Sequence, residues 1–197
     1  MQNLFSFICK SLVLLTALVL SVSVSANSQT SVSITTTQTS VSINVDKKGF
    51  SINQTSLKFP ISVQDIEKVL GKSNRTFAGV QRVSTWDDLG LVGYQQSDID
   101  GFTEIGVIFN IAENKFDFMP KRTFQGQLTV DGAKISNKST RTSINKTKTG
   151  AKFVSLPLMS ALTEAQTGEQ YMVMWQASER GAVPLGTVLQ ISISKAK

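Results

Sequence analysis

Hydrophobic and polar residues alternate along most of the chain from residue 82 onward. A period of two is typical of strands, because successive side chains of a strand point to opposite faces of a sheet. The Asp131 and Gly132 pair between two of these runs predicts a two-residue hairpin turn. The pattern predicts strands at residues 82–86, 91–95, 104–111, 124–130, 133–135, 171–175 and 187–194.

A helical period replaces the alternation at residues 63–70. Ser62 stands before this run with Asp65 three residues later, which is the spacing of a capping box, and Gly71 follows as a stop signal. Apolar residues at positions 63, 66 and 70 share one face of the expected helix. A short helix is therefore predicted over this run.

Two further segments are expected to lie outside the sheet. Leu158 and Leu162 have helical spacing behind Pro157, which predicts a second short helix that ends at Gly168. Residues 136–150 are polar and basic, so an exposed loop is expected there. A mainly antiparallel sheet with one or two short helices predicts a single α+β domain.

The first 26 residues have the layout of a secretory signal peptide. One basic residue, Lys10, precedes an uncharged run over residues 11–24, which ends in the small residues Ser25 and Ala26. The alternative is a transmembrane anchor, but a bilayer span needs about 20 apolar residues, and this run is shorter and rich in serine. Cleavage is expected after Ala26, with the mature protein in the periplasm or secreted.

Removal of 26 residues from 197 leaves 171, enough for one domain with a sizeable core. Residues 27–38 are rich in serine and threonine and are expected to form a linker. The domain is then expected at residues 39–197. Its first strand, with alternating Val41, Ile43 and Val45, is expected at an edge of the sheet.

The composition excludes whole classes of chemistry. The chain has no histidine, and its one cysteine, Cys9, leaves with the signal peptide. A cysteine-free exported domain is typical of bacteria, because small secreted eukaryotic domains usually depend on disulfides. Catalytic triads with histidine and zinc sites made of histidine and cysteine are excluded. No cofactor is expected.

The adjacent carboxylates of Asp87 and Asp88 are the first candidates for chemistry. In a strand the two side chains would point to opposite faces and could share neither a proton nor a metal ion. With Gly90 following between two predicted strands, they are typical of a turn, and Trp86 before them is expected in the core. The pair is therefore predicted to be a structural motif, and a functional acidic site is the alternative.

A calcium site is the most specific form of that alternative. Asp98, Asp100 and Glu104 lie close by in the sequence, but the position of the glutamate does not fit the loop of an EF-hand. A calcium site of another kind stays open. We predict no catalytic, cofactor-binding or metal-binding residue.

Charge is distributed unevenly along the domain. Residues 87–117 contain seven acids and one lysine, a net charge of −6, whereas residues 121–152 contain eight basic residues and one aspartate, a net charge of +7. Such asymmetry can steer a partner, and it also arises from two solvated faces. The expected partner is another protein or, through the basic loop, an anionic envelope surface. Nucleic acid is not expected, because aromatic residues do not interleave with the lysines. The candidate interaction residues are Asp98, Asp100, Glu104, Lys138, Arg141, Lys146 and Lys148.

Four segments in order carry a resemblance to a known family. They are FPISVQDIEKVLGKSNR, STWDDLGLVGY, EIGVIFNI and FQGQLTVDGAKI. Together they resemble an uncharacterised bacterial domain family marked by a helix ending in LG, a WDDLG turn and an F-x-G-x-L-x-x-x-G hairpin. The likeness covers residues 51–135, and it implies a fold without assigning catalytic residues. The order of helix and sheet is also similar to β-lactamase-inhibitor-protein and outer-membrane-assembly lipoprotein domains, which bind other proteins.

These observations favour a non-enzymatic exported module that binds another protein, such as an inhibitor, an immunity-type protein or an envelope assembly factor. The alternative is a carboxylate- or lysine-dependent hydrolase that acts on a cell-wall or glycan substrate. That alternative requires two carboxylates that converge in a pocket.

Overall fold

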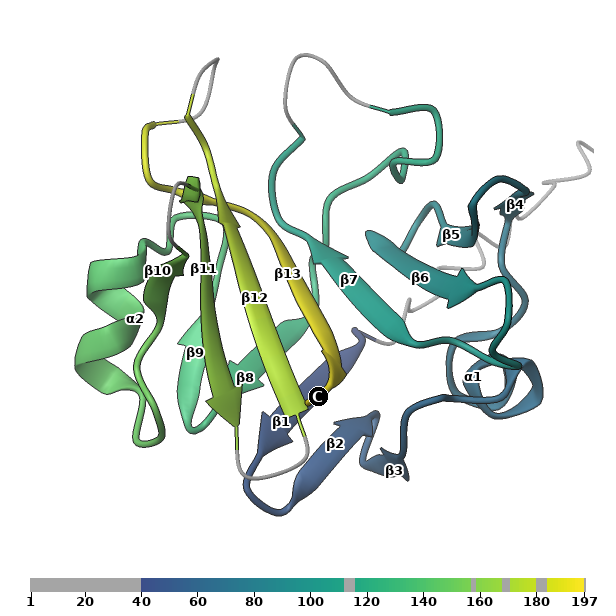
Figure 1. Ribbon diagram of the computed structural model, residues 1–197, viewed down its shortest axis with the longest axis horizontal. Coiled ribbons are helices and arrows are strands. Elements are labelled where there is room, and N and C mark those ends of the chain that lie inside the picture. Colours follow the sequence, from purple (N-terminus) through teal and green to yellow (C-terminus); the bar gives the residue numbers. More distant parts are fainter. Residues whose placement is uncertain (1–39, 112–115, 157–158, 168–170, 180–183, 197) are drawn as a thin grey trace, which may run out of the picture. The chain divides into compact units, whose positions relative to one another are not determined.

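The computed structural model describes residues 40–111, 116–156, 159–167, 171–179 and 184–196 (Figure 1). The chain separates into two units, Met1–Thr37 and Gln38–Lys197, and the second contains all of the described residues. The predicted signal peptide and the predicted linker lie outside the described residues.

A five-stranded sheet has the order β3-β2-β1-β8-β9. Its strands are β1 (Ser42–Asp46), β2 (Gly49–Ile52), β3 (Thr55–Leu57), β8 (Gln127–Val130) and β9 (Ala133–Ile135). β1 pairs antiparallel with β2 and parallel with β8, so it lies at the centre of the sheet. The expectation of an edge strand is wrong, because Ile43 and Val45 belong to the buried core and both sides of β1 are paired.

An eight-stranded sheet has the order β10-β11-β12-β13-β7-β6-β5-β4, and all of its neighbouring strands are antiparallel. The last strand, β13, lies between β12 and β7, so the C-terminal strands join the sheet at its middle (Figure 1). The predicted α+β class and its antiparallel strands are therefore confirmed. The bounds are β4 (Arg75–Phe77), β5 (Gln81–Trp86), β6 (Leu91–Gln96), β7 (Glu104–Ile108), β10 (Val154–Leu156), β11 (Met159–Thr167), β12 (Tyr171–Ala177) and β13 (Val188–Lys195).

The predicted first helix forms as α1 (Val63–Leu70). The Ser62 hydroxyl oxygen accepts a hydrogen bond from the Asp65 N–H at 3.1 Å, and the Asp65 carboxylate accepts one from the Ser62 hydroxyl at 2.8 Å. Gly71 ends the helix with φ +78°. Ile66 is the helix residue that is fully buried, so the helix joins the core through one face.

One hydrophobic core is shared by the two sheets. Val45 and Leu128 of the five-stranded sheet belong to the same buried cluster as Val173 and Ile191 of the eight-stranded sheet. Each such side chain contributes roughly 1.5–3 kcal/mol on burial, so this shared core is the main source of stability. The opposite side of the eight-stranded sheet is called the outer face below.

The second helix expected behind Pro157 does not form, and that prediction is wrong. Met159–Thr167 is strand β11, which pairs with β12 in continuous register from Leu162 to Thr167. A few apolar residues at helical spacing cannot exclude a strand, and the long antiparallel partner decides the conformation here.

The expectation of an exposed loop at residues 136–150 is also wrong, because α2 (Arg141–Thr147) forms within it. Thr140 caps this helix: its hydroxyl oxygen accepts a hydrogen bond from the Ser143 N–H at 3.2 Å, and the Ser143 hydroxyl oxygen accepts one from the Thr140 N–H at 3.0 Å. Ile144, which is 3% exposed, anchors the helix in the core. The cap and this buried apolar residue therefore favour a helix within the polar stretch, and Asn145 adds two hydrogen bonds to the Phe153 backbone.

Lys148 is buried in an ion pair with Asp131. The lysine Nζ donates to the Asp131 carboxylate and to the Ala151 carbonyl oxygen, and the lysine side chain is 0% exposed. The Thr167 hydroxyl donates to the same carboxylate at 3.3 Å, and the Thr149 hydroxyl donates to the Asp131 carbonyl at 2.8 Å. Lys148 is therefore removed from the predicted set of interaction residues, because no partner can reach it.

We expect Lys148→Met to lower the free energy of unfolding by about 3 kcal/mol, because it leaves a buried carboxylate without its counter-ion. The double variant Lys148→Met/Asp131→Asn removes both charges and should recover most of that loss, since asparagine tolerates the φ of +43° at position 131. Urea denaturation measures both effects. Lys146→Met, at an exposed position of α2, is the matched control and should change stability by less than about 0.5 kcal/mol. Equal losses in the single and the double variant would contradict this role of the pair.

Candidate functional site

The WDDLG segment forms the tight turn between β5 and β6, as its composition predicted. The Trp86 carbonyl oxygen accepts hydrogen bonds from the N–H groups of Leu89 at 3.2 Å and Gly90 at 3.1 Å. Gly90 has φ +69°, and a Cβ there would lie 2.2 Å from the backbone nitrogen of Phe124. Trp86 is buried, and its indole N–H donates to the Gly71 carbonyl oxygen at 2.8 Å. The turn therefore needs glycine for both its conformation and its close neighbour.

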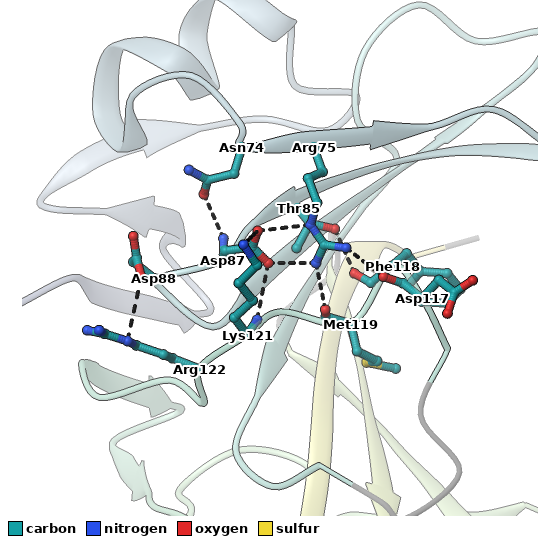
Figure 2. Close-up of polar contacts among 10 residues, drawn as sticks. All are labelled: Asn74, Arg75, Thr85, Asp87, Asp88, Asp117, Phe118, Met119, Lys121 and Arg122. Carbon is teal, nitrogen blue, oxygen red and sulfur yellow. Dashed lines mark hydrogen bonds and ion pairs between the residues drawn. The ribbon is translucent and has the colours of Figure 1, made fainter.

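Asp87 is the centre of a buried polar network (Figure 2). Its carboxylate accepts two hydrogen bonds from the Arg75 guanidinium, from Nε at 2.8 Å and from Nη2 at 2.6 Å. It also accepts one from the Lys121 N–H at 3.1 Å, and the Asp87 N–H donates to the Asn74 side chain at 2.7 Å. The side chain of Asp87 is only 5% exposed. Such bidentate pairing of arginine with a carboxylate is strong and fixes both groups in orientation.

Arg75 connects this turn to the segment at residues 116–122 (Figure 2). Its guanidinium donates to the carbonyl oxygens of Asp117 at 2.7 Å and Met119 at 2.8 Å. The hydroxyl of Thr85 donates to the neighbouring Phe118 carbonyl at 2.7 Å. This segment is therefore held against the outer face, where Val83, Val92 and Ile108 form a small buried cluster. Five half-buried residues pack against that cluster: Phe77, Tyr94, Ile111, Phe118 and Met119.

The ion pair shifts the pKa values of both Asp87 and Arg75. The Arg75 hydrogen bonds hold the pKa of Asp87 below its ordinary value, and the Asp87 carboxylate raises the pKa of Arg75. Asp88 points away from Asp87 (Figure 2), and its exposed carboxylate lies 3.6 Å from Nε of Arg122. The two aspartates therefore do not converge on a common proton or metal ion. The arrangement is suited to anchoring the chain.

The other predicted acidic residues lie away from Asp87. Asp98 and Asp100 are exposed in the turn between β6 and β7, at the opposite end of β6 from Asp87. Glu104 begins β7 and is half-buried, and burial raises its pKa. Among the residues that the structure describes, no three side chains of histidine, cysteine, aspartate or glutamate come together to hold a metal ion. The hypothesis of a calcium site built from these acids receives no support from this geometry.

The predicted basic residues divide between the surface and the interior. Lys138, Arg141 and Lys146 are exposed around α2, whereas Lys148 is buried. Two other residues of the basic stretch neutralise the acidic turn: Lys121 lies 3.9 Å from Asp87, and Arg122 contacts Asp88. The charge asymmetry of the sequence is therefore partly cancelled in space.

Two hollows were not expected from the sequence. One, of about 450 Å³, lies between the ends of the β4–β5 and β6–β7 hairpins and is bordered by Arg82, Asp98 and Asp100. The other, of about 640 Å³, lies on the outer face and is bordered by residues that include Glu104 and Met174. Only one feature of the sequence points to the second hollow. The alternation of residues 171–175 places two methionines on the face opposite the core.

This geometry defines a class of protein, namely a two-sheet α+β domain with an ion-paired hairpin turn and an open outer face. The chain belongs to the DUF7738 family, a domain of unknown function, whose profile matches residues 42–145. The predicted membership of an uncharacterised domain family is thus confirmed, while the WDDLG mark and the likeness to inhibitor-type domains stay predictions. Curated proteins and solved structures gave no significant match.

The family match ends inside α2, so strands β10 to β13 lie beyond it. Within the described part of the chain, no helix has the length and apolar character needed to cross a bilayer.

We expect Asp87→Asn to lower the free energy of unfolding by about 3 kcal/mol at neutral pH, because Arg75 then keeps its charge without a counter-ion. The contribution of Asp87 is present above the pKa of an unfolded aspartate, near 3.9, because its folded pKa is depressed. It is lost as the pH falls through that lower folded value. Urea denaturation at neutral and acidic pH should therefore show the wild-type advantage shrinking below about pH 4. Asp88→Asn, at the exposed neighbour, should cost less than about 1 kcal/mol at either pH. An Asp87→Asn variant as stable as Asp88→Asn would contradict the anchoring role.

Proposed function

We propose that this chain is an exported bacterial protein that binds another protein and catalyses no reaction. The observation that carries the proposal is an apolar and acidic surface at the ends of the β4–β5 and β6–β7 hairpins. Val80 is 94% exposed there and Ile99 is 37% exposed, beside the exposed carboxylates of Asp98 and Asp100. These four residues are called the hairpin-end surface below.

The two hairpin ends are neighbours in the fold. Gln81 of β5 pairs with Gln96 of β6, so the turns that precede Gln81 and follow Gln96 leave the same end of the sheet. The hollow of about 450 Å³ lies between them. An aliphatic side chain at the tip of a hairpin gains nothing from the core, and apolar groups ringed by charge are typical of protein interfaces. The carboxylates favour a partner that presents apolar and basic side chains together.

The positions of the carboxylates favour binding over hydrolysis. Asp87 is committed to Arg75, Asp98 lies at the hairpin-end surface, and Glu104 borders the adjacent hollow on the outer face, which shares Ile99 with that surface. Glu164 borders that hollow too, but β13 and β12 lie between its strand and that of Glu104. Their backbones are therefore about 14 Å apart at the usual strand spacing, so the two glutamates do not come from neighbouring strands.

Export is the first part of the proposal to test. When the full chain is produced in a bacterial host, we expect the periplasmic or secreted protein to begin at Asn27 and to contain 171 residues, because the signal peptide is cleaved after Ala26. Intact mass measurement and N-terminal sequencing check this. A chain that stays in the cytoplasm with residues 1–26 attached would contradict export.

Affinity capture from the envelope fraction of the native host tests the binding role. A partner captured by the wild type should be lost with Ile99→Asp and with the charge-reversed pair Asp98→Lys/Asp100→Lys, because these changes remove the apolar contact and the acidic rim. Lys146→Glu is the matched control at an exposed site on α2 and should retain the partner. Loss with Lys146→Glu alone would assign the contact to the basic surface instead, and capture that is unchanged by all the variants would contradict the hairpin-end surface.

A further inference from the structure

We propose that the hollow on the outer face of the eight-stranded sheet binds a linear alkylammonium group, with the ammonium at Glu104 and its hydrocarbon chain against Met172 and Met174. This inference rests on the hollow alone and does not depend on the proposed function.

The floor of the hollow is built by strand register across β7, β13, β12 and β11, which lie side by side (Figure 1). Glu104 is opposite Ser194, which is opposite Met172 on the next strand. The adjacent row on the same face runs from Gly106 through Ser192 to Met174. Small residues therefore lie between the glutamate and the methionines, and they leave the volume of about 640 Å³ open above the sheet.

Glycine at position 106 keeps this floor low. A Cβ at Gly106 would lie 2.6 Å from a Val92 methyl group and 2.9 Å from the Gln190 side-chain nitrogen. Because position 106 is glycine, the Gln190 amide has room to donate a hydrogen bond to the Ser192 hydroxyl oxygen at 2.7 Å. Burial raises the pKa of Glu104, and the nearby Ser192 side chain partly opposes this shift. The floor is thus polar, with one carboxylate at its edge.

The Glu104 carboxylate lacks a cationic partner among the described residues. Tyr94 faces it from β6 and stays neutral, because burial raises its pKa to about 12. Glu164 is the other acid of the hollow. Lys195 also borders the hollow, but its cross-strand partner is the buried Tyr171, so alternation directs the lysine side chain to the other face. A ligand cation would therefore supply the counter-ion that Glu104 lacks.

The methionines determine the rest of the ligand. Met172 and Met174 are half-buried on the outer face, and their unbranched thioethers adapt to a flexible chain. Phe59 and Ile99 add apolar surface at the rim. A cation on a straight hydrocarbon chain satisfies both halves of the hollow, whereas a compact hydrated cation would leave the methionines unused. Free alkylamines and the lysine side chain of a partner protein share this chemistry.

Calorimetric titration of the folded mature protein with n-hexylamine tests the site, with n-hexanol as the uncharged probe of equal chain length. We expect hexylamine to bind at least about tenfold more tightly than hexanol, because only the amine pairs with the carboxylate. Glu104→Gln should reduce hexylamine affinity to that of hexanol. Affinity should also rise with pH from about 4.5 to 7, because burial keeps Glu104 protonated at pH values where an exposed glutamate is already charged.

A second variant keeps the test decisive if Glu104→Gln disturbs folding. Met172→Lys introduces an ammonium on the same face, which reaches toward Glu104 across Ser194, and it should abolish hexylamine binding in a protein that melts no earlier than the wild type. Equal affinity for amine and alcohol, no detectable amine binding at about 10 mM, or retained amine binding in folded Met172→Lys would overturn the proposal. Lysine with its α-amino group acetylated, its α-carboxyl group amidated and its side-chain amine free distinguishes a partner's lysine from a free alkylamine. If it binds as tightly as hexylamine, the natural ligand is a protein side chain. If it binds much more weakly, the natural ligand is a free amine. Capture through the hairpin-end surface can fail without affecting any of these outcomes.

Discussion

The pairing of β13 with β7 is the constraint on which the rest of the structure depends. Ile191 and Ile193 of β13 lie opposite Val107 and Ile105 of β7, and all four side chains are fully buried. Without this pairing, the strand formed by residues 104–108 would be an apolar edge, open to association with other chains. The last strand of the chain thus completes a sheet that begins within the family-matched residues 42–145. It also brings the C-terminal methionines and Glu104 to one face.

Two buried ion pairs share a second principle. Asp87 and Asp131 both lie at hairpin turns, and each binds a cation that also holds backbone carbonyls of an irregular segment. Buried pairs of this kind add little net stability over apolar residues of the same size, because desolvation offsets the attraction. They are strongly orienting, however, since an unpaired buried charge is costly. In this protein they position the segments at residues 116–122 and 148–151 on the sheets.

The outer face of the eight-stranded sheet has two different environments, because an ion pair holds a segment of chain over only one part of it. Over β4 to β6, the anchored segment at residues 116–122 covers it, and its half-buried Phe118 packs against the buried Val83 and Val92. Toward β11 the same face is hollow and presents Glu104 with the methionines of β12. The WDDLG turn therefore affects only the covered part of this face, because Arg75 and Asp87 anchor the covering segment, whereas the hollow is bordered by residues of other segments.

Local patterns in the sequence, such as helix caps and alternation, determined α1 and most of the strands. Ser62 and Gly71 bound α1 through hydrogen bonds within a few residues, and the strands with clear alternation formed where they were expected. The Asp87 and Asp88 pair was also correctly placed in a turn, but its main role was not visible, because Arg75 is twelve residues away and the anchored segment lies further along the chain.

The remaining features depended on contacts between distant residues. Strand β11 replaced the expected helix because β12 paired with it, and Ile144, the single apolar residue of the stretch 136–150, anchors α2 by entering the core. The hollow at Glu104 likewise arises from register across four strands, of which β7 is separated by about fifty residues from its nearest companion in sequence. The sequence alone determined caps, turns and alternation, because these act over a few residues. Only the tertiary structure decided which strands became neighbours, because the free energy of burial depends on which faces meet.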